Sequence, residues 1–168
     1  MTRTASSRRG GAGPGDGRPG AGRVIAGSAR GIRLVGPAEG VRPLGDRLKQ
    51  AMFAILEPAI RRGAVLDLFA GTGAAGIEAL SRGAASATFV ELDGRAIEAL
   101  ERNLVATHLA GPAATIVRAE ALTWLTRSLA GPGFAVVIVD PPYDRPDLLV
   151  GALERLAAAG PGVILTAT

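Results

Sequence analysis

The sequence predicts an α/β protein built on a doubly wound, mostly parallel sheet. One observation is the stretch Val65 to Gly73, which reads as a buried strand that breaks into a glycine turn before a helix. A second is that short apolar strands alternate with helical segments at the spacing of repeated βαβ units. A third is the 48% hydrophobic content of the 168 residues, which is enough for one sizeable core.

Two segments precede the sheet. Residues 1–22 are rich in glycine, arginine, serine and proline without apolar periodicity, so we expect a disordered basic tail there. Residues 23–62 should form an N-terminal extension that contacts a substrate. Within it, Arg23 to Val35 predicts a short β-hairpin, two strands around a Gly-Ser turn.

A helix should close this extension. Asp46 is a suitable N-cap for a helix from Arg47 to Leu56, and Pro58 should bend or end it. Its apolar face is expected from Leu48, Met52, Ile55 and Leu56, with Arg47 and Lys49 pointing elsewhere.

The sheet domain should occupy residues 63–168. Its expected strands are Val65 to Phe69, Ala87 to Glu91, Thr115 to Arg118, Phe134 to Val139 and Gly162 to Leu165. The helices expected between them are Ala74 to Arg82, Gly94 to Leu109, Glu120 to Leu129 and Pro146 to Ala159. Ligands of such sheets bind at the carboxyl ends of the strands.

The glycine turn indicates a nucleotide-like ligand. Gly71 lets the backbone turn sharply, and Gly73 leaves no side chain where a ligand would touch the backbone. With Gly76 these residues match a pattern that fits NAD, FAD or S-adenosylmethionine. Asp67 favours S-adenosylmethionine, because a buried carboxylate needs a partner and the methionyl ammonium supplies one. The alternative is that Asp67 caps a nearby turn.

Further acids follow the next strands. Glu91 lies about 20 residues after the glycine turn and would accept hydrogen bonds from both ribose hydroxyls. Asp93 could do so instead, although capping the next helix is favoured for it. Glu120 should lie near the adenine edge or, alternatively, stabilise the first turn of a helix. The candidate residues for binding S-adenosylmethionine, called the donor below because it donates a methyl group, are Asp67, Phe69, Ala70, Gly71, Thr72, Gly73, Glu91, Glu120, Ala121 and Asp140.

Asp140-Pro141-Pro142-Tyr143 follows a wholly apolar strand, and these four are the candidate catalytic residues. The two prolines fix the backbone and remove two N–H donors, which leaves carbonyls free to accept. With Asp140 they make an acceptor-rich notch, and Tyr143 offers a flat face for stacking. That set suits a planar base with an exocyclic amine, flipped out of its stack and positioned for reaction. The alternative is a proline-rich turn without chemistry.

The charge is unevenly distributed. Residues 1–62 hold 12 Arg and Lys against 4 Asp and Glu, a net charge of +8, whereas residues 63–168 hold 7 against 11, a net charge of −4. A basic front end predicts a polyanionic partner, and arginine suits phosphate contacts. The candidate residues for contacts with this polyanion, which the family resemblance described below implies to be RNA, are Arg23, Arg30, Arg33, Arg42, Arg47 and Lys49.

Composition excludes several other classes of protein. The chain has no cysteine, which excludes disulfides and thiolate metal sites, and its one histidine, His108, excludes a histidine cluster, so we expect no metal. No apolar run is long enough to span a membrane, and the N-terminus lacks the apolar centre of a secretory signal. An organellar transit peptide is the alternative interpretation of the tail, although no amphipathic helix pattern supports it.

Taken together, these motifs resemble those of class I S-adenosylmethionine-dependent methyltransferases with an [Asn/Asp]-Pro-Pro-[Tyr/Phe] motif, and more closely the RsmD family. The matching stretches are Arg23 to Gly27, Arg42-Pro43 with Asp46-Arg47, Asp67 to Gly73, Glu78 to Ala84 and Asp140 to Tyr143. The resemblance implies a Rossmann-like methyltransferase fold and methylation of the 2-amino group of a guanine in 16S ribosomal RNA. It also implies a cytoplasmic protein, a monomer, that acts on 16S rRNA or the assembling 30S subunit.

The chain departs from the RsmD pattern at two places. Leu44-Gly45 stand where the family usually has Thr and a small polar residue. The family's sheet continues with a hairpin of two strands, and an acidic residue usually follows the fifth strand, where Thr166-Ala167-Thr168 stand here. We therefore expect a sheet that lacks the last hairpin and leaves one edge unpaired.

Two other functions compete with this interpretation. Adenine-N6 or cytosine-N4 methylation of DNA shares the Asp-Pro-Pro-Tyr motif, but it normally needs a target-recognition domain that no segment here is long enough to form. A catalytically weak or silent rRNA-binding or assembly module with the same fold is the alternative from another class. Whether the chain binds S-adenosylmethionine at all would separate the two enzyme interpretations from the silent module.

Overall fold

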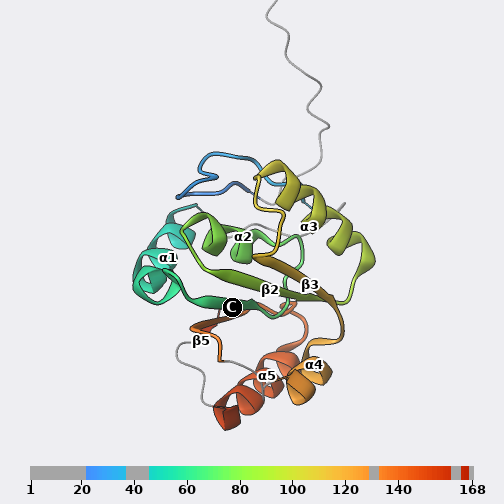
Figure 1. Cartoon of the computed structure of the whole chain (residues 1–168). Coiled ribbons are helices and arrows are strands. Elements are labelled where there is room, and N and C mark those ends of the chain that lie inside the picture. Colours follow the sequence, from blue (N-terminus) through green and yellow to red (C-terminus); the bar gives the residue numbers. More distant parts are fainter. Residues whose placement is uncertain (1–21, 37–45, 129–132, 160–163, 167–168) are drawn as a thin grey trace, which may run out of the picture.

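The computed structural model describes residues 22–36, 46–128, 133–159 and 164–166, and the account below concerns these residues (Figure 1). The expected basic tail, apart from Gly22, and Arg42 lie outside them. No helix in these ranges is long and apolar enough to cross a membrane. The same ranges contain no group of His, Cys, Asp and Glu side chains that could hold a metal ion.

Five strands in the described residues form one sheet in which every neighbouring pair is parallel. The strands are β1 (Ala64–Asp67), β2 (Ser86–Glu91), β3 (Ala114–Arg118), β4 (Val136–Val139) and β5 (Ile164–Thr166), in the order β3-β2-β1-β4-β5. The helices are α1 (Asp46–Ile60), α2 (Ala74–Ser81), α3 (Gly94–Ala106), α4 (Ala121–Ser128) and α5 (Pro146–Ala159). The strand order reverses direction at β1, as in a doubly wound fold.

Helices cover both faces of the sheet, which confirms the predicted fold class. Figure 1 shows α1, α2 and α3 on one side of the strands and α4 and α5 on the other. Successive residues of a strand point to opposite faces, so Leu66 packs towards α4 and α5 while Val65 packs towards α1. In β4, Val137 and Val139 share the first of these clusters, and Val136 and Ile138 share the second. The apolar runs of β1 and β4 thus reflect strands buried on both faces.

The helix α1 differs from the sequence-based expectation. It runs to Ile60 with Pro58 inside it, on the exposed side, where solvent can meet the carbonyl that the missing N–H leaves free. The buried apolar residues are Phe53, Leu56 and Ile60, whereas Ile55 is 80% exposed. Burial of Leu56 is therefore confirmed, and the place of Ile55 on the apolar face is wrong.

The predicted hairpin over Arg23 to Val35 is also wrong in detail. One antiparallel bridge joins Arg23 and Arg33, and the rest of the segment forms turns. Its side chains Val24, Ala29 and Leu34 are buried in the core that α2 and α3 share. Backbone hydrogen bonds still join its two arms, from Val24 N–H to the Ile32 carbonyl and from Leu34 N–H to the Gly22 carbonyl, while Ile25, Ala26 and Ala29 donate to side chains of α2.

Candidate active site

Three acids converge at the carboxyl ends of neighbouring strands. Asp67 ends β1, Glu91 ends β2, and Asp140 directly follows β4. In the register of the sheet, Asp67 lies opposite Phe89 of β2 and Ile138 of β4. Burial is the main cause that raises the pKa of Asp67, and the negative charges of Asp140 and Glu91 add to it. The structure thus brings together the three acids that the strand pattern places at the ligand-binding edge.

Asp67 is 2% exposed, and burial is the main reason why its pKa rises to about 7. Its Oδ2 accepts a hydrogen bond of 2.8 Å from the backbone N–H of Gly76, in the first turn of α2. The capping role considered from the sequence is therefore present. No hydrogen bond from the described residues reaches Oδ1. A buried carboxylate of this kind is best satisfied by a cation.

The glycine turn between β1 and α2 has two left-handed glycines, Gly71 with φ 53° and Gly73 with φ 80°. A Cβ added to Gly71 would meet no atom within 4 Å, so this glycine faces open space. A Cβ added to Gly73 would overlap the side chain of Leu100 on α3. The missing side chain of Gly73 therefore makes room for α3, a packing role that the sequence analysis did not foresee, and contact of its backbone with a ligand stays a prediction.

Glu91 supports the same turn. Its Oε2 accepts from the Gly71 N–H at 2.7 Å, and its Oε1 accepts from the N–H groups of Leu92 at 2.7 Å and Asp93 at 2.8 Å. A carboxylate offers about four acceptor sites, so three are occupied by the backbone. Binding both ribose hydroxyls requires one of these contacts to be exchanged or shared.

Two other acids cap helices. Asp93 accepts from the N–H groups of Arg95 at 2.7 Å and Ala96 at 2.9 Å, which confirms the favoured expectation that it caps α3. These bonds lower the pKa of Asp93. Glu120 accepts from the N–H groups of Thr123 and Leu122 in the same way at the start of α4.

Hydrogen bonds from Thr123 are the main cause that lowers the pKa of Glu120. The first-turn role considered for Glu120 is therefore observed, and Ala121 beside it is buried. Contact of this pair with an adenine stays a prediction.

Asp140 to Tyr143 form a turn between β4 and α5. Burial raises the pKa of Asp140 to about 6, and its carboxylate has no hydrogen-bond donor among the described residues. The carbonyl of Pro142 accepts from the N–H of Arg145 at 3.0 Å, which holds the turn, and the Pro141 carbonyl has no such partner in the same ranges. Tyr143 is 73% exposed. One carboxylate, one carbonyl and one aromatic face are thus available to a ligand.

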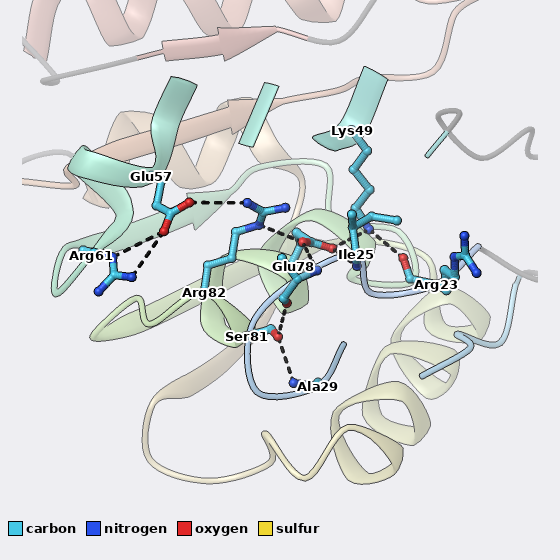
Figure 2. Close-up of polar contacts among 10 residues, drawn as sticks. Arg23, Ile25, Ala29, Lys49, Glu57, Arg61, Glu78, Ser81 and Arg82 are labelled. Atoms are coloured by element: carbon cyan, nitrogen blue, oxygen red, sulfur yellow. Dashed lines mark hydrogen bonds and ion pairs between the residues drawn. The ribbon is translucent and has the colours of Figure 1, made fainter. Parts of the chain in front are cut away.

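The basic residues separate into two groups. Arg23, Arg30, Arg33 and Arg47 are exposed, as a phosphate-binding surface requires. Lys49 is 7% exposed, with its Nζ 3.3 Å from Glu78 Oε2 and 3.3 Å from the carbonyl of Arg23, as Figure 2 shows. The expectation that Lys49 lies on this surface is corrected, because its charge faces a buried acid.

Glu78 on α2 organises this buried cluster (Figure 2). It is fully buried and accepts from the N–H groups of Ile25 at 2.8 Å and Ala26 at 3.1 Å. It also pairs with Arg82 at 2.7 Å. The N-terminal segment is therefore attached to the helix that follows the glycine turn.

The sequence analysis did not assign a role to Glu78 or to Asn103. Glu78 lies inside one of the motif stretches, on a helix whose neighbours are apolar. Asn103 interrupts the apolar face that Leu100 and Leu104 define on α3, and it is fully buried. A polar residue on an apolar helical face was the available signal for both residues.

Known proteins show the same fold and sequence pattern. The chain matches the family described as conserved hypothetical protein 95 over residues 22–163. Curated relatives named ribosomal RNA small subunit methyltransferase D include those of Haemophilus influenzae, 42% identical over 122 residues, and Escherichia coli K12, 41% identical over 124 residues. The matches cover 72% and 73% of this chain, and 63% and 61% of the relatives. The chain thus spans about three fifths of the length of these relatives.

Solved structures agree with the sequence matches. The Escherichia coli protein yhhF has a TM-score of 0.70 and 37% identity, covering 83% of this chain and 73% of that one. A hypothetical protein of Thermus thermophilus has a TM-score of 0.73 and 38% identity, covering 84% of this chain and 79% of that one. The chain therefore belongs to the family described as conserved hypothetical protein 95, the RsmD family whose motifs it carries.

Proposed function

We propose that the chain binds S-adenosylmethionine and methylates the 2-amino group of a guanine in 16S rRNA, either free or in an assembling 30S subunit. The observation that carries this proposal is the placement of Asp67 and Asp140 at the ends of adjacent parallel strands, beside the glycine turn and the exposed Tyr143. Curated relatives are named as small-subunit ribosomal RNA methyltransferases, which supports the same substrate class.

The described residues fit the methyl donor. Among the described residues, the buried Asp67 carboxylate accepts one hydrogen bond, from Gly76, and the methionyl ammonium would pair directly with it. Gly71 faces open space, and Glu91 lies beside it to meet the ribose. The remaining donor contacts are proposed for Phe69, Ala70, Thr72, Gly73, Glu120, Ala121 and Asp140. When bound, S-adenosylmethionine supplies an electrophilic methyl group on a sulfonium.

Asp140, Pro141 and Tyr143 would hold the base. The guanine 2-amino nitrogen is a poor nucleophile, because its lone pair is delocalised into the ring. Acceptance of its hydrogens by the Asp140 carboxylate and the Pro141 carbonyl would keep that nitrogen oriented towards the methyl group. Tyr143 would stack on the extruded base, and Pro142 would hold the turn. The gain is mainly positioning, which can lower a barrier by about 7–11 kcal/mol.

The basic segment would bind the RNA backbone. Arg23, Arg30, Arg33 and Arg47 are exposed, and Arg42 joins them from the sequence pattern. Lys49 is not part of this proposal because it is buried against Glu78. Contacts to phosphates by arginine would make RNA affinity fall as the salt concentration rises.

The test is nucleoside mass spectrometry after incubation with S-adenosylmethionine and either naked 16S rRNA or 30S particles. N2-methylguanine should appear with one or both substrates, and duplex DNA should stay unmodified. The Asp140→Ala variant serves as the control for contaminating activity. N6-methyladenine in place of N2-methylguanine would overturn the choice of base, and donor binding without any methyl transfer would favour a silent RNA-binding module.

A further inference from the structure

Asn103 on α3 is a buried polar side chain that the proposed chemistry does not use. Its Nδ2 donates to the carbonyl of Thr72 at 2.9 Å and to the carbonyl of Val35 at 3.0 Å. Its Oδ1 accepts from the N–H of Val35 at 2.7 Å. Both amide hydrogens are therefore used, and they join two segments that are distant in sequence.

The two segments belong to different parts of the proposed function. Thr72 lies in the glycine turn, whose Gly71 is held from the other side by Glu91. Val35 lies near the end of the N-terminal segment 22–36, which carries three of the exposed arginines. Figure 1 shows this segment, in blue, beside α2 and α3.

Other contacts bind the segment to α2 but do not reach the turn. Glu78 accepts from Ile25 and Ala26, and Ser81 Oγ accepts from the N–H of Ala29 at 2.9 Å. Among the hydrogen bonds of the described residues, those of Asn103 are the ones that connect segment 22–36 with the glycine turn. A displacement of Val35 would leave buried amide groups of Asn103 unpaired, which is unfavourable.

We propose that Asn103 is a positioning residue that couples the RNA-binding segment to the donor-binding turn. This inference rests on the proposed function. The two segments share one hydrogen-bonded side chain, so a ligand that holds one of them in place also holds the other. RNA should therefore tighten donor binding, and the donor should tighten RNA binding by the same factor.

The measurement is the affinity for S-adenosylhomocysteine, by calorimetry, with and without a saturating 16S rRNA fragment. The ratio of the two dissociation constants is the coupling factor, which we expect to be about fivefold or more in the wild type. Asn103→Asp keeps the size of the side chain and the acceptor for Val35. It replaces the two donated hydrogens by an oxygen that faces two carbonyls, so the coupling factor should fall to near one.

Two further variants keep the test informative. Thr107→Val removes a buried hydroxyl at the C-cap of α3, whose hydrogen bonds go to the Asn103 carbonyl at 2.7 Å and the Leu104 carbonyl at 3.2 Å. It should retain the coupling factor of the wild type. Val35→Pro removes the N–H that Asn103 Oδ1 accepts and leaves the bond to Thr72 possible. It should reduce the coupling factor while changing donor affinity without RNA less than threefold.

The outcomes separate this inference from the proposed function. A wild-type chain that binds both ligands with a coupling factor near one, or a factor equal in wild type and Asn103→Asp, overturns the role of Asn103 alone. Equal loss of coupling in Thr107→Val also overturns it, because loosening of α3 would then explain the effect. A wild-type chain that binds neither ligand overturns the proposed function and the inference together.

Discussion

The Oε2 atom of Glu91 accepts a 2.7 Å hydrogen bond from the backbone N–H of Gly71, which joins the end of β2 to the turn after β1. The other carboxylate oxygen accepts from Leu92 and Asp93. The acid proposed to bind ribose therefore also shapes the turn beside which the donor would lie. Replacing Glu91 should affect the ligand contact and the turn together.

Glu91→Ala should weaken S-adenosylhomocysteine binding by about 1–3 kcal/mol, the scale for lost hydrogen bonds to a charged group. Calorimetry measures this loss directly. Asp93→Ala is the matched control, because Asp93 is the neighbouring acid and its carboxylate caps α3. That control should leave donor affinity unchanged. Unchanged affinity in Glu91→Ala, or an equal loss in both variants, would refute the ribose assignment.

Gly71 and Gly73 should respond differently to the same substitution. Gly71→Ala places a methyl group in open space at the proposed donor site, so its structural cost should be only the strain at φ 53°, about 1–2 kcal/mol, while donor affinity should fall at least tenfold. Gly73→Ala places it against Leu100, which should destabilise the fold by about 1–3 kcal/mol through overpacking. Thermal unfolding and calorimetry on both variants separate the two effects. Full donor affinity in a folded Gly71→Ala variant would move the site elsewhere.

Local sequence patterns were sufficient for the sheet and for the acids at its edge. Apolar runs and glycine turns locate β1 and β4, and parallel connection then places Asp67 and Asp140 together. Lys49 could not be placed in this way, because its burial depends on Glu78, which approaches only in the folded chain. The packing role of Gly73 depends on Leu100 in the same manner. The pattern of a single sequence does not show which residues that are distant along the chain contact each other in the fold.

Asp67 should make stability and donor binding respond oppositely to pH. Its pKa is about 7 in the folded chain against 3.8 as the ordinary value, so the folded state binds the proton more tightly. Between these values the contribution of Asp67 to stability falls as pH rises. Asp67→Asn should remove this dependence and stabilise the free chain at pH 8 by up to about 4 kcal/mol. Denaturant unfolding of the wild type and the variant at pH 5 and pH 8 measures the pH dependence of stability and the stability gained by the variant.

Donor binding gives the second half of this prediction. A protonated Asp67 cannot pair with an ammonium group, so S-adenosylhomocysteine affinity should fall as pH decreases through about 7. Asp67→Asn should bind weakly at every pH. Asp147→Asn, at an exposed position on α5, is the control and should keep the wild-type profile. A wild-type affinity that is independent of pH between 5 and 8 would contradict the proposed pairing.

The exposed arginines of the N-terminal part should determine the salt dependence of RNA binding. Replacing Arg30, Arg33 and Arg47 with glutamine should reduce the slope of log affinity against log salt by about one for each lost phosphate contact. Filter binding over a range of salt concentrations measures the slope. Donor affinity in the absence of RNA should not change.

Two control variants sharpen this experiment. Arg127→Gln removes an exposed charge from α4, on the opposite face of the sheet, and should leave the slope unchanged (Figure 1). Lys49→Gln should lower the stability of the fold, because Glu78 loses a buried partner. The slope of log RNA affinity against log salt, measured on the folded protein, should stay unchanged. If deletion of residues 1–22 alone abolishes RNA binding, the folded arginine surface is the wrong candidate.

Asp140→Ala should leave donor binding largely intact and reduce methyl transfer about a hundredfold or more, as expected when one preorganised polar contact is lost. Burial raises the pKa of Asp140 to about 6, and only the ionised carboxylate offers all its acceptor sites to the amine. The single-turnover rate should therefore fall as pH decreases through about 6. Asp144→Ala, two residues beyond the prolines and exposed, is the control.

Tyr143 tests the stacking part of the same mechanism. The ring is 73% exposed in the free chain, so its removal should not disturb the core. Tyr143→Ala should raise the barrier by about 1–3 kcal/mol through lost stacking on the base, whereas Tyr143→Phe keeps the aromatic face and should be nearly silent. Single-turnover rates on 30S particles compare the two variants. Equal losses in both would assign the effect to the hydroxyl group, and full activity of Asp140→Ala would overturn the mechanism.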